Sequence, residues 1–246
     1  MITLFTAGPG FDLPERSPYV TKTEVQLRMA GLDYRKQPAR PDVSPKGQLP
    51  WIEDEGELIA DSHFIRLHLE DKYDLDFDEA LTPAERAQAW AVERMVENQF
   101  GWTVVQTRWL VQENFDKGPA AFFADVPEPV RQQIQREVQA EVAANMRAVG
   151  VGRHSPPEIL ELGVRSLTAL SALVGDKPFL MGDRPCGSDA IVFGMLAALY
   201  TPCFDSALRR EALRFDNLKR YVDRLMGQFY PDFAWSPLAL ERRVAA

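Results

Sequence analysis

The segment from Pro45 to Tyr73 constrains the fold more than any other part of the 246-residue chain. Two short apolar-rich runs, Trp51–Asp54 and Glu57–Ile59, are separated only by Glu55-Gly56, a dipeptide suited to a tight turn. This spacing predicts a β-hairpin. Pro50 stands directly before the first strand, where a cis peptide bond would turn the chain sharply.

A helix is expected to begin directly after this hairpin. Asp61 and Ser62 precede a helical pattern of apolar side chains, and residues of these types cap the free N–H groups of a first helical turn. The pattern predicts a helix over 62–71. The start of such a helix also offers unpaired N–H groups and positive potential to a ligand.

The rest of the first 75 residues alternates strand and helix signals. Ile2–Phe5 and Asp33–Gln37 read as short strands. Between them, 17–30 is an amphipathic helix that ends at Gly31. A degraded helix can also lie before the hairpin. The order βα, then ββα, predicts an α/β domain of thioredoxin-like fold over residues 1–75.

A helical pattern begins at Thr82, after an acidic linker at 74–81. Thr82, Pro83 and Glu85 form the sequence signature of a capping box with proline at the first helical position. Residues 82–246 are therefore predicted to be an all-helical domain, with helices over 83–115, 127–148, 156–174, 187–200 and 206–229.

Composition excludes several classes of protein. The formal net charge of −8 and a pI near 5.0 argue against a nucleic-acid partner, which requires a basic surface. No apolar run approaches the length of a membrane span, and the N-terminus lacks the pattern of a signal peptide. Cys186 and Cys203 form no disulfide framework and fit a reducing cytoplasm. No spacing of His and Cys predicts a metal site.

The order of Leu49-Pro50, the hairpin and Asp61-Ser62 resembles the glutathione-binding subdomain of the glutathione transferase superfamily. The resemblance implies that the backbone of Leu49, before cis-Pro50, pairs with the cysteinyl part of glutathione. It also implies that Asp61 and Ser62 hold the γ-glutamyl group. The local alternative is a plain helix start at Asp61-Ser62.

The resemblance extends over nearly the whole chain. Many members open a buried helix with Ser/Thr-x-x-Asp, and Asp189 matches the acidic member of this capping box. Cys186 occupies the cap position, so either the box is weakened or Ser188 caps the helix instead. The runs 17–22, 44–52 and 152–155 look most like the branch of metaxin and failed-axon-connections proteins.

Ser17 is the candidate catalytic residue, because the family places its sulfur-activating group before the first helix. A hydroxyl here can donate to the glutathione sulfur, and the helix N-terminus adds positive potential. Lowering a thiol pKa from about 8.5 by one or two units requires about 1.4–2.7 kcal/mol. The alternative is that Ser17 only caps the helix, with Pro18 at its first position. The long loop 7–16 puts the placement of Ser17 in question.

Four further residues are assigned by resemblance. Lys46 can reach the glycyl carboxylate of glutathione, although an exposed loop lysine is often merely solvated. Tyr19, Trp102 and Trp109 are candidates for the electrophile pocket, and the alternative for both tryptophans is helix–helix packing.

The sequence thus predicts a glutathione transferase that activates the glutathione thiolate for attack on a small, apolar electrophile, without a metal. A homodimer is expected from the resemblance. Two alternatives remain open. One is a non-catalytic binding module of the same fold, as in metaxins, and the other is a glutathione-dependent peroxidase or lyase.

Overall fold

The computed structural model describes residues 1–236 and 238. The part from Ile2 to Lys72, here called the sheet unit, contains a four-stranded sheet of order β2-β1-β3-β4. β1 pairs parallel with β2 and antiparallel with β3, and β3 and β4 form the predicted hairpin. This topology confirms the thioredoxin-like prediction. The strands are β1 (Ile2–Thr6), β2 (Tyr34–Pro38), β3 (Trp51–Asp54) and β4 (Glu57–Ala60).

Two helices, α1 (Pro18–Met29) and α2 (Ser62–Lys72), pack on one face of the sheet. Leu4 and Ile52 are cross-strand partners on that face, and neither is exposed to solvent. Burial of each such side chain stabilises the fold by about 1.5–3 kcal/mol. The degraded helix before the hairpin is a single 3₁₀ turn, η1 (Pro41–Val43).

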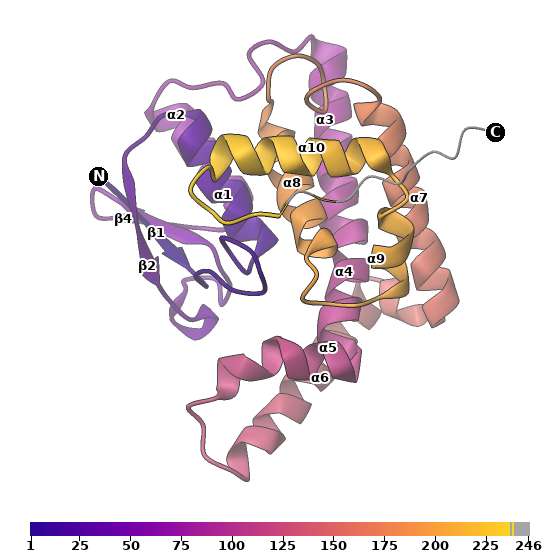
Figure 1. Ribbon diagram of the computed structural model, residues 1–246. Coiled ribbons are helices and arrows are strands. Elements are labelled where there is room, and N and C mark those ends of the chain that lie inside the picture. The colour runs from indigo at the N-terminus through magenta and orange to yellow at the C-terminus, as the bar shows by residue number, and fades with distance from the viewer. Residues whose placement is uncertain (237, 239–246) are drawn as a thin grey trace, which may run out of the picture.

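The rest of the described chain is helical, and Figure 1 shows it packed beside the sheet unit. The almost completely buried α8 lies at its centre and contacts α1, α3, α9 and α10. The elements are α3 (Pro83–Met95), η2 (Val96–Phe100), α4 (Gly101–Val105), η3 (Gln106–Leu110), α5 (Gln112–Lys117), η4 (Pro119–Phe123), α6 (Val130–Ala148), η5 (Val151–Arg153), α7 (Pro156–Val174), α8 (Gly187–Tyr200), α9 (Ala207–Ala212) and α10 (Asp216–Phe229).

Two predicted helices have different bounds in the structure. The helix expected over 83–115 contains two π-helical segments, η2 and η3, and stops at Leu110 because Val111 is extended, with ψ 113°. The helix expected over 127–148 begins only at Val130. Glu128 precedes a proline, and the residue before proline is disfavoured in the helical region.

The prediction of one helix over 206–229 was wrong, because the chain turns between α9 and α10. The Tyr200 hydroxyl donates to the carbonyl of Ala212, at 2.8 Å, where α9 ends. Phe215 then adopts φ −94° and ψ 85°, outside the helical region, directly before α10. The Ala212 carbonyl also accepts the Phe215 N–H at 3.0 Å, so a tight local turn and a long-range hydrogen bond meet where α9 ends.

The capping box of α8 is complete, and Ser188 does not act as the cap. Asp189 accepts hydrogen bonds from the N–H groups of Cys186 and Leu180 (both 2.8 Å) and from the Tyr221 hydroxyl (2.7 Å). The Ser188 hydroxyl donates instead to the carbonyl of Ala89 on α3. Asp189 therefore stabilises the start of the central helix, which is a structural role.

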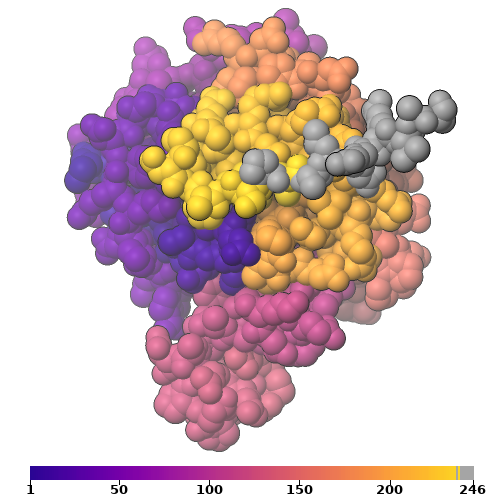
Figure 2. Space-filling view, viewed as in Figure 1, coloured from indigo at the N-terminus to yellow at the C-terminus, as the bar shows by residue number. Residues whose placement is uncertain are grey.

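The sheet unit and the helices share a continuous interface. α1 lies directly on α8, where Gly194 permits the approach, since an added Cβ would lie 2.7 Å from the Pro18 carbonyl oxygen. The guanidinium of Arg28, near the end of α1, donates to the carbonyl of Phe229 at the end of α10. Figure 2 shows α10, in yellow, over the boundary between the sheet unit and the other helices.

Candidate active site

A cleft of about 480 Å³ lies between the sheet unit and the helices, and we call it the polar cleft. Seven of the eight residues predicted to bind glutathione or an electrophile line it or the cavity beside it, together with Ser17. The polar cleft is lined by Tyr19, Gln48, Leu49, Pro50, Asp61, Ser62, His63, Phe64, Arg94, Glu97, Asn98, Gly101, Trp102, Val105 and Val149.

The sheet unit presents backbone groups to this cleft. The Leu49–Pro50 peptide bond is cis, and the Pro50 carbonyl accepts a hydrogen bond from the Asp61 N–H at 3.2 Å. This bond brings the residues before β3 and after β4 together. Within the described part of the chain, no hydrogen bond is made by the backbone N–H or carbonyl of Leu49. Both groups can therefore pair with an extended ligand.

Asp61 and Ser62 form the start of α2 at the floor of the cleft. The Asp61 carboxylate caps the helix by accepting the N–H of His63 at 2.8 Å, and Gln48 donates to it at 3.4 Å. Asp61 has φ 83°, a conformation that residues other than glycine rarely adopt. Such backbone conformations are common at ligand sites. Ser62 is only 5% exposed, and it lies at the positive end of the helix.

Charged residues from α3 and η2 form the opposite wall, and the sequence reasoning missed them. Arg94 donates to Glu93 and Glu97, at 2.8 and 2.7 Å, while its Nε is buried without a hydrogen-bond partner. Lys22 of α1, fully buried, binds both glutamates at 2.8 Å. The attraction of Lys22, Arg66 and Arg94 lowers the pKa of Glu93 despite its burial. In the sequence these residues read only as a charged helix face.

A second, smaller cavity of about 220 Å³ adjoins the polar cleft, and we call it the Ser17 cavity. Tyr19, Gly101 and Val105 line both, so they form the wall between the two spaces. The Ser17 cavity is lined by Ala7, Phe11, Arg16, Ser17, Pro18, Tyr19, Gly101, Val104, Val105, Arg108, Trp109, Pro119, Phe122 and Met195.

Ser17 is the N-cap of α1. Its hydroxyl oxygen accepts the N–H of Val20 at 3.4 Å, a long hydrogen bond that leaves the hydroxyl proton free for another acceptor. The buried carboxyl group of Glu15 accepts a hydrogen bond from the Ser17 N–H at 3.5 Å. Burial raises the pKa of Glu15 to about 7, against the opposing attraction of Lys36.

Tyr19 stands between the two spaces and keeps its proton at neutral pH. Its hydroxyl is 3.4 Å from the carbonyl oxygen of Glu97, and burial raises its pKa well above the ordinary value. Trp109 lines the Ser17 cavity, and its part in an electrophile pocket stays a prediction. Trp102 lies in the polar cleft instead.

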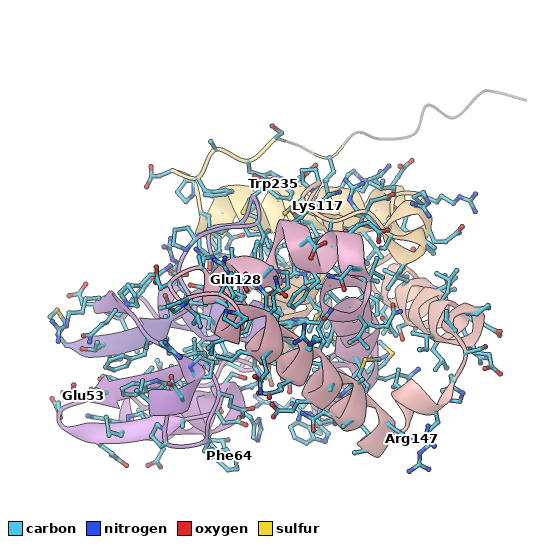
Figure 3. All side chains as sticks on the ribbon, turned by 90° about the horizontal axis from the view of Figure 1, so that it is seen from below. Glu53, Phe64, Lys117, Glu128, Arg147 and Trp235 are labelled. Atoms are coloured by element: carbon cyan, nitrogen blue, oxygen red, sulfur yellow. The ribbon has the colours of Figure 1, made fainter. Side chains whose placement is uncertain are left out.

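Lys46 lines neither space. Its ammonium lies 4.0 Å from the centre of the Phe64 ring, which itself lines the polar cleft. Figure 3 shows Phe64 at the outer edge of the sheet unit. Lys46 therefore lies at the rim of the polar cleft. It could contact the glycyl carboxylate of glutathione only if that carboxylate extended out of the cleft.

Comparison with known proteins agrees with this geometry. A family model described as the glutathione S-transferase N-terminal domain matches residues 18–114, and one for the C-terminal domain matches residues 163–225. The isoprene-epoxide glutathione S-transferase of Rhodococcus sp. is 30% identical over 207 residues, covering 80% of this chain and 85% of that protein. The chain belongs to the glutathione S-transferase family.

Two further relatives of the chain are not named as transferases. Failed axon connections of Drosophila melanogaster is 32% identical over 234 residues, and human metaxin-1 is 28% identical over 204 residues. These alignments cover 90% and 78% of this chain. The chain spans only 56% of the length of Failed axon connections and 43% of metaxin-1. The resemblance to the metaxin and failed-axon-connections branch is confirmed.

Solved structures confirm the glutathione S-transferase fold. A glutathione S-transferase of Ceriporiopsis subvermispora in complex with glutathione superimposes with a TM-score of 0.62 at 18% identity. The match covers 97% of this chain and 99% of that structure.

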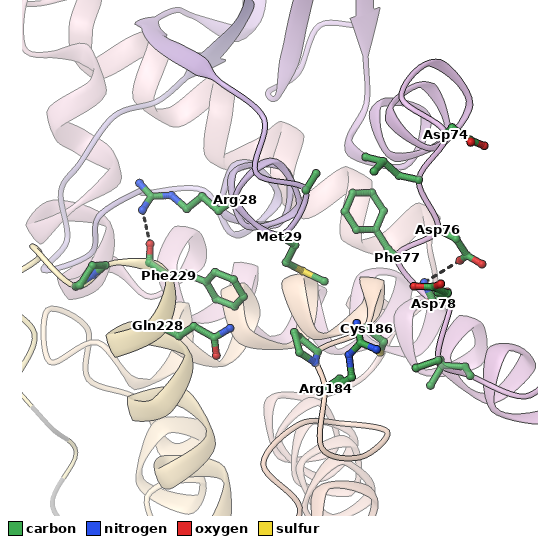
Figure 4. A pocket seen from close by; sticks show the side chains of 17 residues that line it. Arg28, Met29, Asp74, Asp76, Phe77, Asp78, Arg184, Cys186, Gln228 and Phe229 are labelled. Atoms are coloured by element: carbon green, nitrogen blue, oxygen red, sulfur yellow. Dashed lines mark hydrogen bonds between the residues drawn. The ribbon is translucent and has the colours of Figure 1, made fainter.

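A larger cavity, of about 790 Å³, contains none of the predicted site residues (Figure 4). It lies at the junction of the end of α1, the linker 74–81 and the segment before α8. Within it, the Asp78 N–H donates to Asp76, and Arg28 donates to the carbonyl of Phe229. Cys186 lines it with a thiol whose pKa is raised by burial. Because none of the predicted site residues lies here, we assign this cavity no role in the reaction.

Two further observations concern the described residues only. No group of three or more His, Cys, Asp or Glu side chains is arranged there to hold a metal ion. Of the helices in residues 1–236, none has the length and apolar character needed to span a bilayer.

Proposed function

We propose that this protein is a serine-type glutathione transferase. Reduced glutathione would occupy the polar cleft, and a small electrophile would occupy the Ser17 cavity. The supporting observation is that the two spaces adjoin at Tyr19, with Ser17 at the N-terminus of α1 beside that wall.

The polar cleft fits a zwitterionic peptide such as glutathione. The unpaired backbone groups of Leu49 suit the cysteinyl part, since an extended peptide pairs with backbone N–H and carbonyl groups. At the γ-glutamyl end, the carboxylate of Asp61 would attract the ammonium group, and Ser62 with the start of α2 would bind the carboxylate. The Nε of Arg94 and the Nδ1 of His63, which make no hydrogen bond, are further buried polar atoms of residues that line this cleft.

Ser17 would act on the sulfur. Its hydroxyl donates to the glutathione sulfur and stabilises the thiolate over the thiol, and the positive end of α1 adds to this effect. The thiolate then attacks the electrophilic carbon, so that a carbon–sulfur bond forms while the bond to the leaving atom breaks. The leaving atom takes the electron pair. Holding both reactants side by side supplies much of the acceleration.

The identity of the first electrophile to assay comes from a relative. The Rhodococcus protein is named for isoprene epoxide, a small molecule. Small epoxides are compatible with a cavity of about 220 Å³ and its apolar walls. We therefore propose epoxides as the first compounds to test.

Calorimetric titration with reduced glutathione tests the binding step. We expect binding in the micromolar to low millimolar range, and its loss in an Asp61→Ala/Ser62→Ala double variant. Arg136→Met on the exposed face of α6 is a control that should bind as the parent does. Absence of both heat and a thermal shift at ten millimolar glutathione would exclude the proposed function.

Conjugation of isoprene epoxide tests the role of Ser17. Ser17→Ala should lower kcat by about one to two orders of magnitude, because about 1.4–2.7 kcal/mol of thiolate stabilisation would be lost, while glutathione affinity stays nearly unchanged. An unchanged kcat would remove Ser17 from the mechanism and leave it as a helix cap.

A non-catalytic binding module is the second candidate function. It is favoured by the match to Failed axon connections and metaxin-1, which is as close as the match to the transferase. Glutathione binding without turnover of any electrophile would support it. A glutathione-dependent peroxidase or lyase would instead show turnover with hydroperoxides or halogenated substrates without accumulation of a glutathione conjugate, and no turnover with aryl halides.

We also propose a homodimer formed through the outer faces of α2 and α3. Phe64, Leu67 and Trp90 are about half exposed there, at 52%, 46% and 48%. The rings of His63 and Trp90 are 5.2 Å apart, so the two helix faces adjoin. Exposed large apolar side chains that gather on one face are typical of interfaces. Light scattering should give twice the chain mass, and Trp90→Glu should give a monomer.

A further inference from the structure

The long loop between β1 and α1 builds one wall of the Ser17 cavity. Gly10 and Leu13 exchange two backbone hydrogen bonds of 3.1 Å, and the two residues between them, Phe11 and Asp12, have φ of 60° and 54°. Positive φ at both central residues is the pattern of a type I′ turn. A bulky residue such as phenylalanine rarely adopts this conformation. It persists only where the surrounding structure holds it.

Phe11 is held by contacts far away in the sequence. The Thr201 hydroxyl donates to its carbonyl at 2.6 Å, and its ring meets those of Phe204 and Phe122 edge-on, with centres 5.1 and 5.8 Å apart. The ring of Trp109, which lines the same cavity, is stacked on that of Phe122, with ring centres 6.2 Å apart. The loop therefore contributes a fixed aromatic surface to the Ser17 cavity.

Arg108 places a buried positive charge in this aromatic surrounding. The side chain is only 6% exposed, and it donates to the backbone carbonyls of Arg16 and Ala198. No carboxylate of the described residues forms an ion pair with it, and its Nε has no hydrogen-bond partner. Burial lowers the pKa of Arg108 only to about 10, so that it remains charged at neutral pH. Carbonyl groups are neutral, and its charge is therefore uncompensated.

Arg16 adds a second positive charge to the same cavity. Its Nε donates to the Pro9 carbonyl at 2.9 Å, and its guanidinium lies 5.4 Å from the centre of the Phe122 ring. Gly10 makes room for this arrangement, because an added Cβ would lie 2.3 Å from the Arg16 Nε. Among the described residues, Arg16 forms no ion pair either. The residues that line the Ser17 cavity include two arginines and no acid.

A buried charge without a partner is unfavourable, and a bound ion of opposite charge removes that cost. We propose that the Ser17 cavity binds a small aromatic or unsaturated electrophile that carries a carboxylate. The ring would lie against Phe11, Phe122 and Trp109, and the carboxylate would pair with Arg16 and Arg108. A neutral epoxide fits the apolar walls but leaves both guanidinium groups unpaired.

This inference rests on the proposed function for the identity of the ligand as an electrophile. With 4-(chloromethyl)benzoate as substrate, the glutathione thiolate attacks the benzylic carbon, a carbon–sulfur bond forms and chloride leaves with the electron pair. The carboxylate takes no part in bond breaking. Its role is to hold the ring in place.

Binding of two unreactive compounds of nearly equal shape tests the proposal without requiring turnover. Calorimetry should show that 4-methylbenzoate binds at least about tenfold more tightly than 4-methylbenzamide, which corresponds to 1.4 kcal/mol. Arg16→Met and Arg108→Met should each abolish most of this preference. Arg16→Met is the less disruptive variant, because Arg108 also donates hydrogen bonds to two backbone carbonyls. Arg136→Met on exposed α6 is the matched control and should keep the full preference.

The outcomes separate this inference from the proposed function. Equal affinity for the two compounds, or a preference that survives in both cavity variants, would overturn the inference. A preference that is lost in Arg16→Met supports it. Failure of glutathione to bind in its own titration would overturn the transferase proposal, and the carboxylate measurement would still decide whether the Ser17 cavity is an anion site.

Discussion

The polar cleft and the Ser17 cavity are neighbours, yet they are built in opposite ways. The polar cleft contains charges of both signs, and most of them already have partners, as Arg94 and Glu97 do. The Ser17 cavity contains only positive charge, set among aromatic rings, and neither arginine is paired with an acid of the described chain. A ligand of the polar cleft must therefore compete with existing ion pairs. An anionic ligand of the Ser17 cavity would instead form a new ion pair with Arg16 and Arg108.

The two spaces also differ in the origin of their walls. The glutathione side depends on short segments around Pro50 and Asp61, whose backbone turns are local. The other side depends on Phe11, Arg108 and Trp109, which meet only after the helices have packed. We expect substitutions to separate these contributions.

The largest expected effect comes from the ion cluster below the polar cleft. Lys22→Met would remove the buried ammonium that binds both Glu93 and Glu97 and leave Arg94 as the cation bound to both, and we expect a loss of about 3–5 kcal/mol in the free energy of unfolding. Glutathione affinity should fall too, because Arg94 and Glu97 line the cleft. Urea unfolding measures the first effect, and calorimetry the second.

Two variants control this experiment. Lys46→Met removes an exposed lysine and should change stability by less than about 0.5 kcal/mol. Adding Glu93→Gln and Glu97→Gln to Lys22→Met should restore part of the loss. If Lys22→Met alone were neutral, the cluster would not hold the cleft together.

The next largest effect is the pH dependence of stability that arises from Glu15, beside Ser17. The folded state raises the pKa of Glu15 from 4.5 to about 7, so the folded protein binds more protons than the unfolded chain between these values. The contribution of Glu15 to the free energy of unfolding should therefore fall by about 3 kcal/mol as pH rises from 4.5 to 7, and level off above 7. Glu15→Gln should flatten the curve in this window. Unfolding titrations at pH 4.5, 6 and 8 would show an unaltered slope if Glu15 were not responsible.

Asp61 permits stability and binding to be separated on the polar side. Asp61→Ala removes the helix cap and should cost about 1 kcal/mol, whereas Asp61→Asn should keep nearly all of the stability because asparagine caps equally well. Both variants lose the charge that we propose attracts the ammonium group of glutathione. We expect weaker glutathione binding in both, measured by calorimetry. Full affinity in Asp61→Asn would argue that only the cap matters.

Ser17 should have the smallest effect on stability. Its capping hydrogen bond is long, at 3.4 Å, so Ser17→Ala should lower the free energy of unfolding by about 0.5–1 kcal/mol. Ser17→Thr should be nearly neutral. A large loss in Ser17→Ala would mean that the residue is chiefly structural.

The parts of the fold that could be predicted from the sequence are those with local causes. The hairpin with Pro50, the helix cap at Asp61 and the capping box at Thr82 each involve residues a few positions apart, and the structure shows all three. Turn and cap chemistry requires particular residue types, so it leaves a readable pattern.

The parts that could not be predicted have long-range causes. The break between α9 and α10 is associated with the bond between the Tyr200 hydroxyl and the Ala212 carbonyl, and nothing near Ala212 in the sequence indicates it. Arg108 and Glu93 likewise read as ordinary charged residues of helices. Only the packed structure shows that the first is buried without an acid and that the second binds a buried lysine.

The contact of Gly194 with the first turn of α1 has a consequence for any attempt to divide the molecule. Ser17 belongs to the sheet unit by sequence, but α1 rests on α8 through a glycine that leaves no room for a methyl group. An isolated fragment of residues 1–75 would keep Leu49, Asp61 and Ser62 of the proposed glutathione site and lose the support that positions the hydroxyl of Ser17. The helical half is thus the scaffold on which Ser17 is aligned.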